Sequence, residues 1–392
     1  MTRKKKSVAA AMEAMEVQPG GDLEHGLQQL YAWIGSNVKR SGLETFEQLQ
    51  QAADEGEESA KDPVASVVST RQGSVFEVQM TFLAVARALG ADAQVVFAAD
   101  RTNGPFDPLL KTWGQFDSLL VAVRAPGSTG PYALVDSGSG LAYGDIPWRL
   151  SGGQGMLMTS DGAALIPLPA SNPKKNISES NVEIEFTEGN EAMVRSWVQT
   201  GTGQVGLDER RYLRSLSPDQ RTERIDELCG LGPETDVVTA EVVALEDVNR
   251  NLELHCATES LEHGVTEDIT HYQLEWGGPW IPHLPVLPDE PRAYPVVFDF
   301  PRIDVVRVKV KAPEGYVPGD PPPRAVVDGP VGRYILDIER SDDGFRIERA
   351  ISVMTLSLAK EHYGKLREFV EEARRLDRTP LNFTRADVAD SQ

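Results

Sequence analysis

The stretch from Arg71 to Val96 reads RQGSVFEVQMTFLAVARALGADAQVV, and the first half of the chain can be placed around it. Ser74 and Glu77 have the S-x-x-E spacing of a capping box, in which each side chain satisfies a free backbone N–H of the first helical turn. Apolar residues then recur at helical spacing until Gly90, which is a favourable helix stop. The pattern predicts a buried helix followed by a Val-rich strand over residues 93–99.

Regular patterns continue on both sides of this stretch. Upstream, Asp22 precedes a helical pattern with apolar residues on one face, whereas residues 43–60 are acidic and Gln-rich and indicate a helix plus an exposed loop. Downstream, residues 119–123 and 132–136 are strand candidates separated by a turn-rich segment. Together these patterns predict a compact core over residues 22–170.

Beyond a polar segment at 171–181, which we interpret as a linker, the chain is rich in strand patterns. A charged helical pattern over 203–229 interrupts them, and an amphipathic helical pattern over 358–376 follows them. The strand candidates are residues 182–186, 193–198, 237–245, 252–256, 269–276, 295–300, 305–310, 334–338 and 345–352. The predicted fold class is therefore α+β, with an antiparallel β-rich region over 182–378 that ends in a helix.

Composition and charge limit the classes of partner. The chain has 392 residues, enough for two or three domains, and a formal net charge of −21. Nucleic-acid binding needs clustered Lys and Arg, and an anionic membrane surface repels an acidic protein, so we expect neither partner. No stretch is long and apolar enough to span a membrane. No strand pattern is followed by a phosphate-binding Gly-rich motif, and we predict no cofactor.

The N-terminal sequence MTRKKKSVAAAMEAMEV has a basic cluster and small residues, but Glu13 and Glu16 interrupt it before an apolar segment can form. It is therefore a poor signal peptide, and the chain as written is expected to be cytoplasmic. If the sequence is a fragment, a periplasmic or exported protein is expected instead. Residues 1–21 and 379–392 are predicted to be flexible tails.

Cys229 and Cys256 are the only cysteines in the sequence. Two cysteines cannot form a disulfide framework, and we favour two buried free thiols, which behave as small apolar side chains. A single disulfide and a reactive Cys256 are the alternatives.

The Gly73-Ser74-Val75 segment and the helix behind it resemble the nucleophile segment of the bacterial transglutaminase-like, or papain-like, superfamily. In those proteins the pattern is G-D-C, and the helix ends L-R-A-x-G-I. A Cys at a helix N-terminus is activated because the free N–H groups and the helix dipole favour the thiolate. Val75 stands in that position here, and valine has neither a proton to lose nor a lone pair with which to attack.

The resemblance extends to the other two members of the catalytic triad. Phe116-Asp117-Ser118 matches an F-N-H-like sequence, so Ser118 stands in the His position, and Asp136 matches the Asp of a W-x-x-x-D-P-T-like stretch. Only the orienting Asp remains, and without a nucleophile or a base it cannot carry out acyl transfer. No histidine lies between His25 and His255. We therefore interpret the core as a pseudoenzyme.

Over residues 23–378 the order of elements resembles DUF3857-type bacterial proteins, in which a β-rich region follows the transglutaminase core. Those proteins usually carry a further β-rich domain before the core, and no such pattern precedes it in this sequence. We expect either a fragment, or a role that has been lost or is supplied by a partner.

The resemblance implies a non-catalytic function. We expect the inactive cleft to serve as a peptide- or protein-binding groove or as a scaffold, so that a protein or peptide partner is expected. The cleft candidates are Val75, Trp113, Phe116, Ser118 and Asp136. One alternative is an active hydrolase or amidase with a relocated nucleophile, for which Ser74 and Ser118 are the candidates. Another is a structural subunit of a larger assembly, and the oligomeric state is not predicted.

Four aspartates fall in or beside the predicted cleft, namely Asp100, Asp107, Asp117 and Asp136. Paired carboxylates carry out acid–base work in glycosidases. Loop aspartates cap turns far more often, and we favour that role here.

Two groups in the second half also allow a functional interpretation. His255, His263 and His271 lie among acidic residues, and imidazole and carboxylate are both metal ligands, but exposed histidines are the simpler interpretation. We therefore predict no metal site. The loop 277–283, GGPWIPH, has the rigidity of a recognition surface, but a packed turn is favoured.

Overall fold

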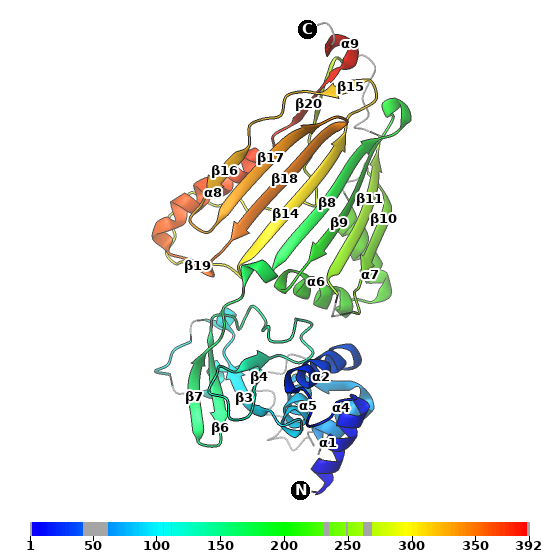
Figure 1. The fold of residues 1–392 in the computed structure, drawn as a ribbon. Coiled ribbons are helices and arrows are strands. Elements are labelled where there is room, and N and C mark those ends of the chain that lie inside the picture. The colour runs from blue at the N-terminus through cyan, green and yellow to red at the C-terminus, as the bar shows by residue number, and fades with distance from the viewer. Residues whose placement is uncertain are drawn as a thin grey trace. The chain divides into compact units, whose positions relative to one another are not determined.

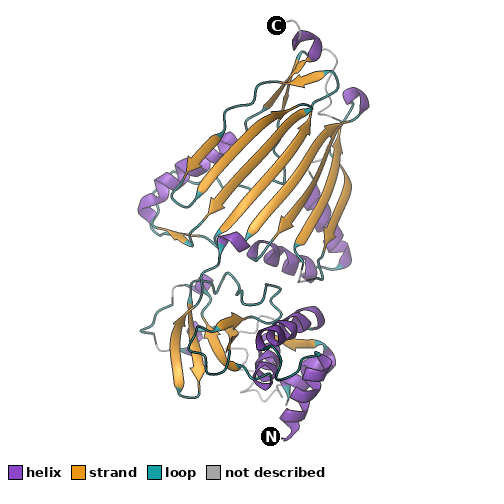
Figure 2. Cartoon of the chain, in the orientation of Figure 1, coloured by secondary structure: helices purple, strands orange, loops and turns teal. Residues whose placement is uncertain are grey.

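The computed structural model describes residues 2–41, 62–104, 106–110, 112–230, 235–247, 250–261 and 269–389. The chain forms two compact units, one of Met1–Ser171 with Glu246–Asn249 and one of Asn172–Leu245 with Arg250–Gln392 (Figure 1). Each unit combines helices with mainly antiparallel sheets (Figure 2), so the predicted α+β fold class is confirmed.

The helices of the first unit share one apolar core with its sheet. They are α1 (Thr2–Ala14), α2 (Leu23–Asn37), α4 (Pro63–Thr70) and α5 (Val75–Ala88). The Asp22 side chain accepts hydrogen bonds from the backbone N–H groups of Glu24 and His25, which confirms the predicted start of α2. The helix and loop predicted over 43–60 lie outside the described residues.

The sheet of the first unit has the strand order β5-β4-β3-β6-β7, and its neighbouring strands are antiparallel. The strands are β3 (Asp92–Ala98), β4 (Ser118–Arg124), β5 (Ala133–Val135), β6 (Gln154–Thr159) and β7 (Gly162–Pro167). Val121 and Val123 of β4 pack with the helices, whereas Leu120 and Ala122 pack into a smaller core on the other face. A parallel pair, β1 (Lys39–Ser41) and β2 (Gln72–Ser74), leads into α5.

The prediction of a flexible tail over residues 1–21 is wrong. Helix α1 occupies most of this segment, and the side chains of Ala11, Met15 and Val17 are buried in the helical core. The apolar residues of this segment recur at the spacing of one helix face, which is typical of a packed helix. The basic cluster at its start is typical of an exposed segment, and this is why the sequence favoured a tail.

Gly73 lies where α4 and α5 approach each other closely. A Cβ atom at this position would lie 2.8 Å from Cγ2 of Val67 and 3.3 Å from Cγ2 of Val78. We expect Gly73→Ala to lower the free energy of unfolding by about 1–3 kcal/mol, because packed side chains would have to shift. Urea unfolding measures this, with Gly21→Ala as the control, since a Cβ there meets nothing within 4 Å. Equal stability of the two variants would contradict the packing argument.

The second unit is built on an eight-stranded sheet of order β10-β11-β9-β8-β14-β18-β17-β16 (Figure 1). Its strands are β8 (Ile177–Phe186), β9 (Met193–Gly201), β10 (Asp236–Val243), β11 (Leu252–Ser260), β14 (Arg302–Lys311), β16 (Ala325–Asp328), β17 (Arg333–Ser341) and β18 (Gly344–Val353). Within the described residues the parallel pair β8 and β14 joins two antiparallel halves. The strand candidates 182–186 and 193–198 fall in the antiparallel pair of β8 and β9, and the candidates 334–338 and 345–352 fall in the antiparallel pair of β17 and β18.

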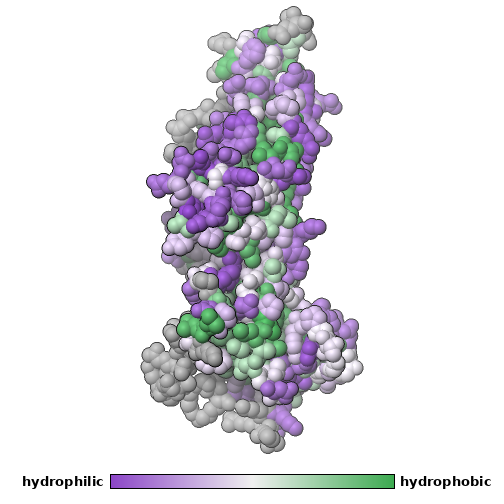
Figure 3. Space-filling model, turned by 90° about the vertical axis from the view of Figure 1, so that its left-hand side faces the viewer, coloured by the Kyte–Doolittle hydropathy of each residue, from purple (hydrophilic) through white to green (hydrophobic). Residues whose placement is uncertain are grey.

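One face of this sheet is covered and the other is open. The remaining elements are α6 (Gln204–Ser215), α7 (Pro218–Cys229), α8 (Tyr363–Leu376), α9 (Ala386–Ala389), β12 (His271–Leu274), β13 (Val296–Val297), β15 (Tyr316–Pro318), β19 (Ser357–Leu358) and β20 (Leu381–Arg385). The apolar side of α8 packs on alternate sheet residues, and its outward side is charged. Figure 3 views the molecule from the side on which α8 lies in Figure 1, and it shows hydrophilic surface there. On the open face charged side chains pair across strands, as Arg307 does with Glu179 at 2.7 Å.

Three boundaries predicted in the second half are wrong. Strand β8 begins inside the predicted linker 171–181. The sequence does not indicate this start, because the buried residues at this end of the strand, Ser178 and Ser180, are polar and give no apolar alternation. The predicted tail 379–392 contains β20, which pairs with β12 and β15 and buries Phe383. The helical segment predicted over 203–229 is two helices, because Pro218 begins a new helix after α6.

The loop 277–283 is a packed turn, as favoured from the sequence. Trp280 is fully buried, and its ring centroid lies 5.1 Å from that of Trp197 on β9. Trp276 beside the loop is also fully buried and donates its indole N–H to the carbonyl oxygen of Thr379 at 3.0 Å. The alternative of an exposed recognition surface is therefore wrong.

Candidate functional site

The three positions matched to a catalytic triad lie on three segments of the first unit. Val75 is the first residue of α5, Ser118 is the first residue of β4, and Asp136 directly follows β5. Val75 and Asp136 are buried, and Ser118 is half-buried. Ser74 accepts a hydrogen bond from the Glu77 N–H at 3.2 Å, and its own N–H donates to Glu77 Oε2 at 2.9 Å, so the predicted capping box is confirmed.

Gln79 connects these segments from a position one helical turn beyond Val75. Its Nε2 donates to the carbonyl oxygen of Leu119 at 3.1 Å and to Oδ1 of Asp136 at 2.9 Å. Its Oε1 accepts from the backbone N–H of Ser137 at 3.4 Å. The amide is fully buried, and a buried amide requires partners of this kind. Helix α5, the start of β4 and the end of β5 therefore meet at Gln79.

Asp136 also forms an ion pair with Arg40, the middle residue of β1. Nη1 of Arg40 lies 2.5 Å from Oδ1 of Asp136 and donates to the carbonyl oxygen of Ser137 at 3.0 Å. Both side chains are largely shielded from solvent. In a catalytic triad the carboxylate accepts a hydrogen bond from the imidazole that it orients. Here the same carboxylate oxygen accepts from a guanidinium and an amide, so Asp136 joins β1 to α5.

Tyr31 of α2 extends this buried polar network. Its hydroxyl donates to the carbonyl oxygen of Leu141 at 2.8 Å and lies 3.3 Å from Oγ of Ser139. Burial raises the pKa of Tyr31 above its ordinary value, so the hydroxyl remains a neutral donor. The network ties α2, α5 and β1 to the segment that follows β5.

The aromatic cleft candidates differ in exposure. Trp113, in a short 3-10 helix over Trp113–Gln115, is 47% exposed, and its ring centroid lies 5.5 Å from that of Phe97 and 6.0 Å from that of Phe116. Phe116 is buried and supports Trp113, whereas Asp136 is enclosed by its partners. Of the binding candidates Trp113, Phe116 and Asp136, Trp113 is the one with an exposed side chain.

The aspartates of the neighbouring loop cap turns, as favoured from the sequence. Asp100 accepts from the N–H of Thr102, and Asp107 accepts from the N–H of Leu109. Asp117 accepts from the N–H of Asp100 at 2.9 Å, and burial raises the pKa of its carboxyl above the ordinary value. These carboxylates are therefore engaged with local backbone groups.

Two of the three candidate histidines, His255 and His271, lie on different sheets. His255 is on β11, where its Nε2 lies 2.9 Å from Oε2 of Glu253, and His271 is on β12. His263 lies outside the described residues. Among the residues that the structure describes, no group of three or more His, Cys, Asp or Glu side chains is arranged to hold a metal ion.

A concavity of about 820 Å³ lies over the open face of the large sheet. Its charged lining includes Arg307, Lys309, Glu183 and Glu339. Positive and negative side chains are mixed there: Lys309 faces Glu183 on one side and Arg346 on the other. Such a mixture of charges is typical of a solvated sheet face. We assign no ligand to it.

Cys229 and Cys256 form a disulfide. The favoured prediction of two free thiols is therefore wrong, and the alternative of a single disulfide is correct. The sequence places one cysteine at the end of a helix and the other in a strand, and only the packing of that helix brings the two together.

Comparison with known proteins identifies one segment of the chain. Residues 283–383 match DUF3858, a domain of unknown function. The segment contains β14, β16, β17 and β18, which are half of the large sheet, together with α8. No curated protein matches this chain.

A crystal structure described as a "putative protease" from Parabacteroides distasonis is similar to this chain, with a TM-score of 0.54 at 12% sequence identity. The similarity covers 97% of this chain and 55% of that one, so this chain spans about half the length of that protein. At this identity the likeness concerns the fold alone.

A helix that crosses a bilayer must be both long and apolar. Within the described ranges, none has both the length and the apolar character to do so.

Sequence reasoning missed Arg40, Gln79 and Tyr31. Gln79 did carry a signal, because it is a polar residue within the otherwise apolar face of a helix, beside Val78. Arg40 carried none, since its contact with Asp136 joins residues 96 positions apart in the chain.

Proposed function

We propose that this chain is a non-catalytic protein with a degenerate transglutaminase-like core, and that it binds a peptide or protein segment. The main support is the environment of Asp136, whose carboxylate is paired with Arg40 and Gln79. Val75, a hydrocarbon, occupies the helix N-terminus where a thiol would be activated. Acyl transfer requires a nucleophile within reach of a base, and this network contains neither a thiol nor an imidazole.

Exposed apolar side chains on one loop support the binding role. Leu109 is 86% exposed, Leu110 is 55% exposed, and Trp113 follows them in the same loop. Trp113 is already packed against Phe97 and Phe116, so it would lose little conformational entropy on binding. A large aromatic side chain held in this way is the usual anchor of a protein-binding surface.

The binding role is tested with a displayed peptide library selected on the wild-type chain. We expect Trp113→Ala to weaken the binding of selected peptides by about tenfold or more, because the aromatic anchor is lost. Leu165→Ala is the matched control, since Leu165 is an exposed apolar residue on β7 of the same unit. Failure to select any peptide would contradict the binding role, and equal affinity of Trp113→Ala would contradict its location.

The non-catalytic role is tested by hydrolysis assays on glutamine amides and peptides, in which we expect no turnover. Ser74→Ala is a poor test of the alternative with a relocated nucleophile, because it also removes a helix cap worth about 1 kcal/mol. Ser118→Ala is more direct. Turnover by the wild type that is abolished in Ser118→Ala would establish the hydrolase alternative.

The match of positions 75 and 118 to the Cys and His of a catalytic triad is tested by introducing these two residue types there. Val75→Cys places a thiol at the start of α5, and the native cysteines give no background because they are joined to each other. We expect Val75→Cys/Ser118→His to react with iodoacetamide near pH 6.5 at least about tenfold faster than Val75→Cys, because a nearby imidazolium stabilises the thiolate. Val75→Cys/Leu165→His is the control. Equal rates in both double variants would show that positions 75 and 118 do not face each other.

A further inference from the structure

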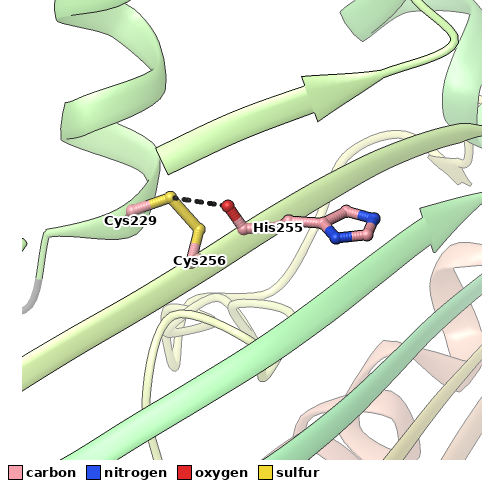
Figure 4. Close-up of a disulfide and its surroundings, with 3 residues drawn as sticks. All are labelled: Cys229, His255 and Cys256. Atoms are coloured by element: carbon pink, nitrogen blue, oxygen red, sulfur yellow. Dashed lines mark hydrogen bonds between the residues drawn. A yellow bond between two sulfur atoms is a disulfide. The ribbon is translucent and has the colours of Figure 1, made fainter. Parts of the chain in front are cut away.

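The disulfide joins the last residue of α7 to the large sheet. Cys229 ends α7, and Cys256 lies in β11 with its Cα atom 5.4 Å from that of Cys229 (Figure 4). Both half-cystines are buried, and Sγ of Cys229 lies 4.0 Å from the carbonyl oxygen of His255. A disulfide sulfur carries no proton, so this last contact is a packing contact.

Few other interactions hold α7 against the sheet. Its sequence is PDQRTERIDELC, and Cys229 is the one buried residue of the helix. Ile225 is partly buried against the core, whereas most of the remaining residues are charged or polar. A helix of this length and composition is not stable without tertiary attachment. Arg221 of α7 donates to the carbonyl oxygen of Leu213 at 3.0 Å and so links α7 to α6. The covalent link is therefore the main attachment of α7 to the large sheet itself.

Helix α7 lies against the edge of the sheet. It contacts β10 and β11, and Cys256 pairs directly with Ala240 of β10. In the described part of the sheet β10 is an edge strand, and Val238 on it is 63% exposed. Edge strands have unpaired backbone groups and depend on what covers them. Loss of α7 would remove the cover from one side of β10.

We propose that the Cys229–Cys256 disulfide is a redox-controlled tether that holds α7 on the sheet edge, and that its reduction frees α7 and loosens β10. A dithiol reductant performs this step: one thiolate attacks a disulfide sulfur to form a mixed disulfide, and the second thiol displaces the protein sulfur. The protein gains two electrons and two protons as two thiols, and the reductant becomes a cyclic disulfide. Because the sulfurs are buried, the attack requires the end of α7 to open first.

The state of the tether depends on the cellular compartment of the protein. Disulfides persist in oxidising compartments and are reduced in the cytoplasm. The tether is closed in the first environment and open in the second, so a closed tether accords with an exported protein rather than with the cytoplasmic expectation.

Hydrogen–deuterium exchange on the full chain tests the tether, comparing the oxidised protein with the protein reduced by dithiothreitol. We expect amides of α7 and β10 to exchange roughly 10–100-fold faster after reduction, while β14 and β18 at the centre of the sheet stay protected. Cys229→Ser/Cys256→Ser is expected to show the reduced pattern without reductant. Dithiothreitol should have no effect on that variant.

Three results would overturn the proposal. Alkylation of the unfolded, unreduced protein at two free thiols would show that no tether forms. Equal exchange of α7 and β10 before and after reduction would show that the disulfide does not hold the helix. Faster exchange throughout β14 and β18 would show global unfolding instead of local release.

Discussion

Arg349→Ala is expected to lower the free energy of unfolding of the second unit by about 3–5 kcal/mol, because it leaves a largely buried carboxylate without its cation. Arg349 on β18 is fully buried. Its Nε lies 3.1 Å from Oδ1 of Asp377, and its Nη2 lies 3.1 Å from Oδ2 of the same carboxylate. Asp377 follows the last residue of α8 and also accepts a hydrogen bond from Tyr334 at 2.7 Å. The ion pair therefore fastens the end of α8 to the sheet.

Urea unfolding followed by circular dichroism measures this loss, and hydrogen exchange of β18 assigns it to the second unit. Arg346→Ala is the matched control, because Arg346 lies on the open face of the same strand and forms no ion pair within the described residues. We expect the control to change stability by less than about 0.5 kcal/mol. Similar losses in both variants would refute a special contribution of the buried pair.

Asp136→Ala is expected to lower the free energy of unfolding of the first unit by about 3–5 kcal/mol. The substitution leaves the shielded guanidinium of Arg40 without its counter-ion and removes one acceptor from the buried amide of Gln79. If Asp136 served only to orient a catalytic base, its removal would leave the stability of the fold nearly unchanged. The experiment therefore separates a structural carboxylate from a catalytic one.

The control for this prediction is Asp161→Ala, in the exposed turn between β6 and β7, with an expected change below about 0.5 kcal/mol. The double variant Arg40→Met/Asp136→Ala should recover part of the lost stability, because no unpaired buried charge remains. No recovery in the double variant would show that the loss does not arise from the stranded guanidinium of Arg40.

Much of the local structure could be predicted from the sequence. The capping box of Ser74 and Glu77, the buried face of α5 and the strands β3 and β4 follow from interactions between residues close in the chain. The same reasoning failed for α1, which begins with a basic cluster, and for β20, which has only two apolar residues, Leu381 and Phe383. In each failure the deciding contacts come from elsewhere in the fold.

The candidate site likewise has features that the sequence indicates and features that it does not. The resemblance to the transglutaminase-like superfamily pointed to Val75, Ser118 and Asp136, but the sequence did not indicate the partners of Asp136. Gln79 and Arg40 reach Asp136 across 57 and 96 residues of chain. A sequence motif does not indicate which distant cation pairs with a carboxylate in the folded protein.

The sequence by itself determined elements such as α2, α5, β3 and β4, and it placed a hydrocarbon at the N-terminus of α5, because these depend on side chains a few residues apart. The tertiary structure alone decided the Cys229–Cys256 link, the parallel seam of β8 and β14 and the pairing of Arg40 with Asp136. These contacts join segments that are distant in the chain. Their energy depends on burial and on the distance between charges, both of which exist only after the segments have packed.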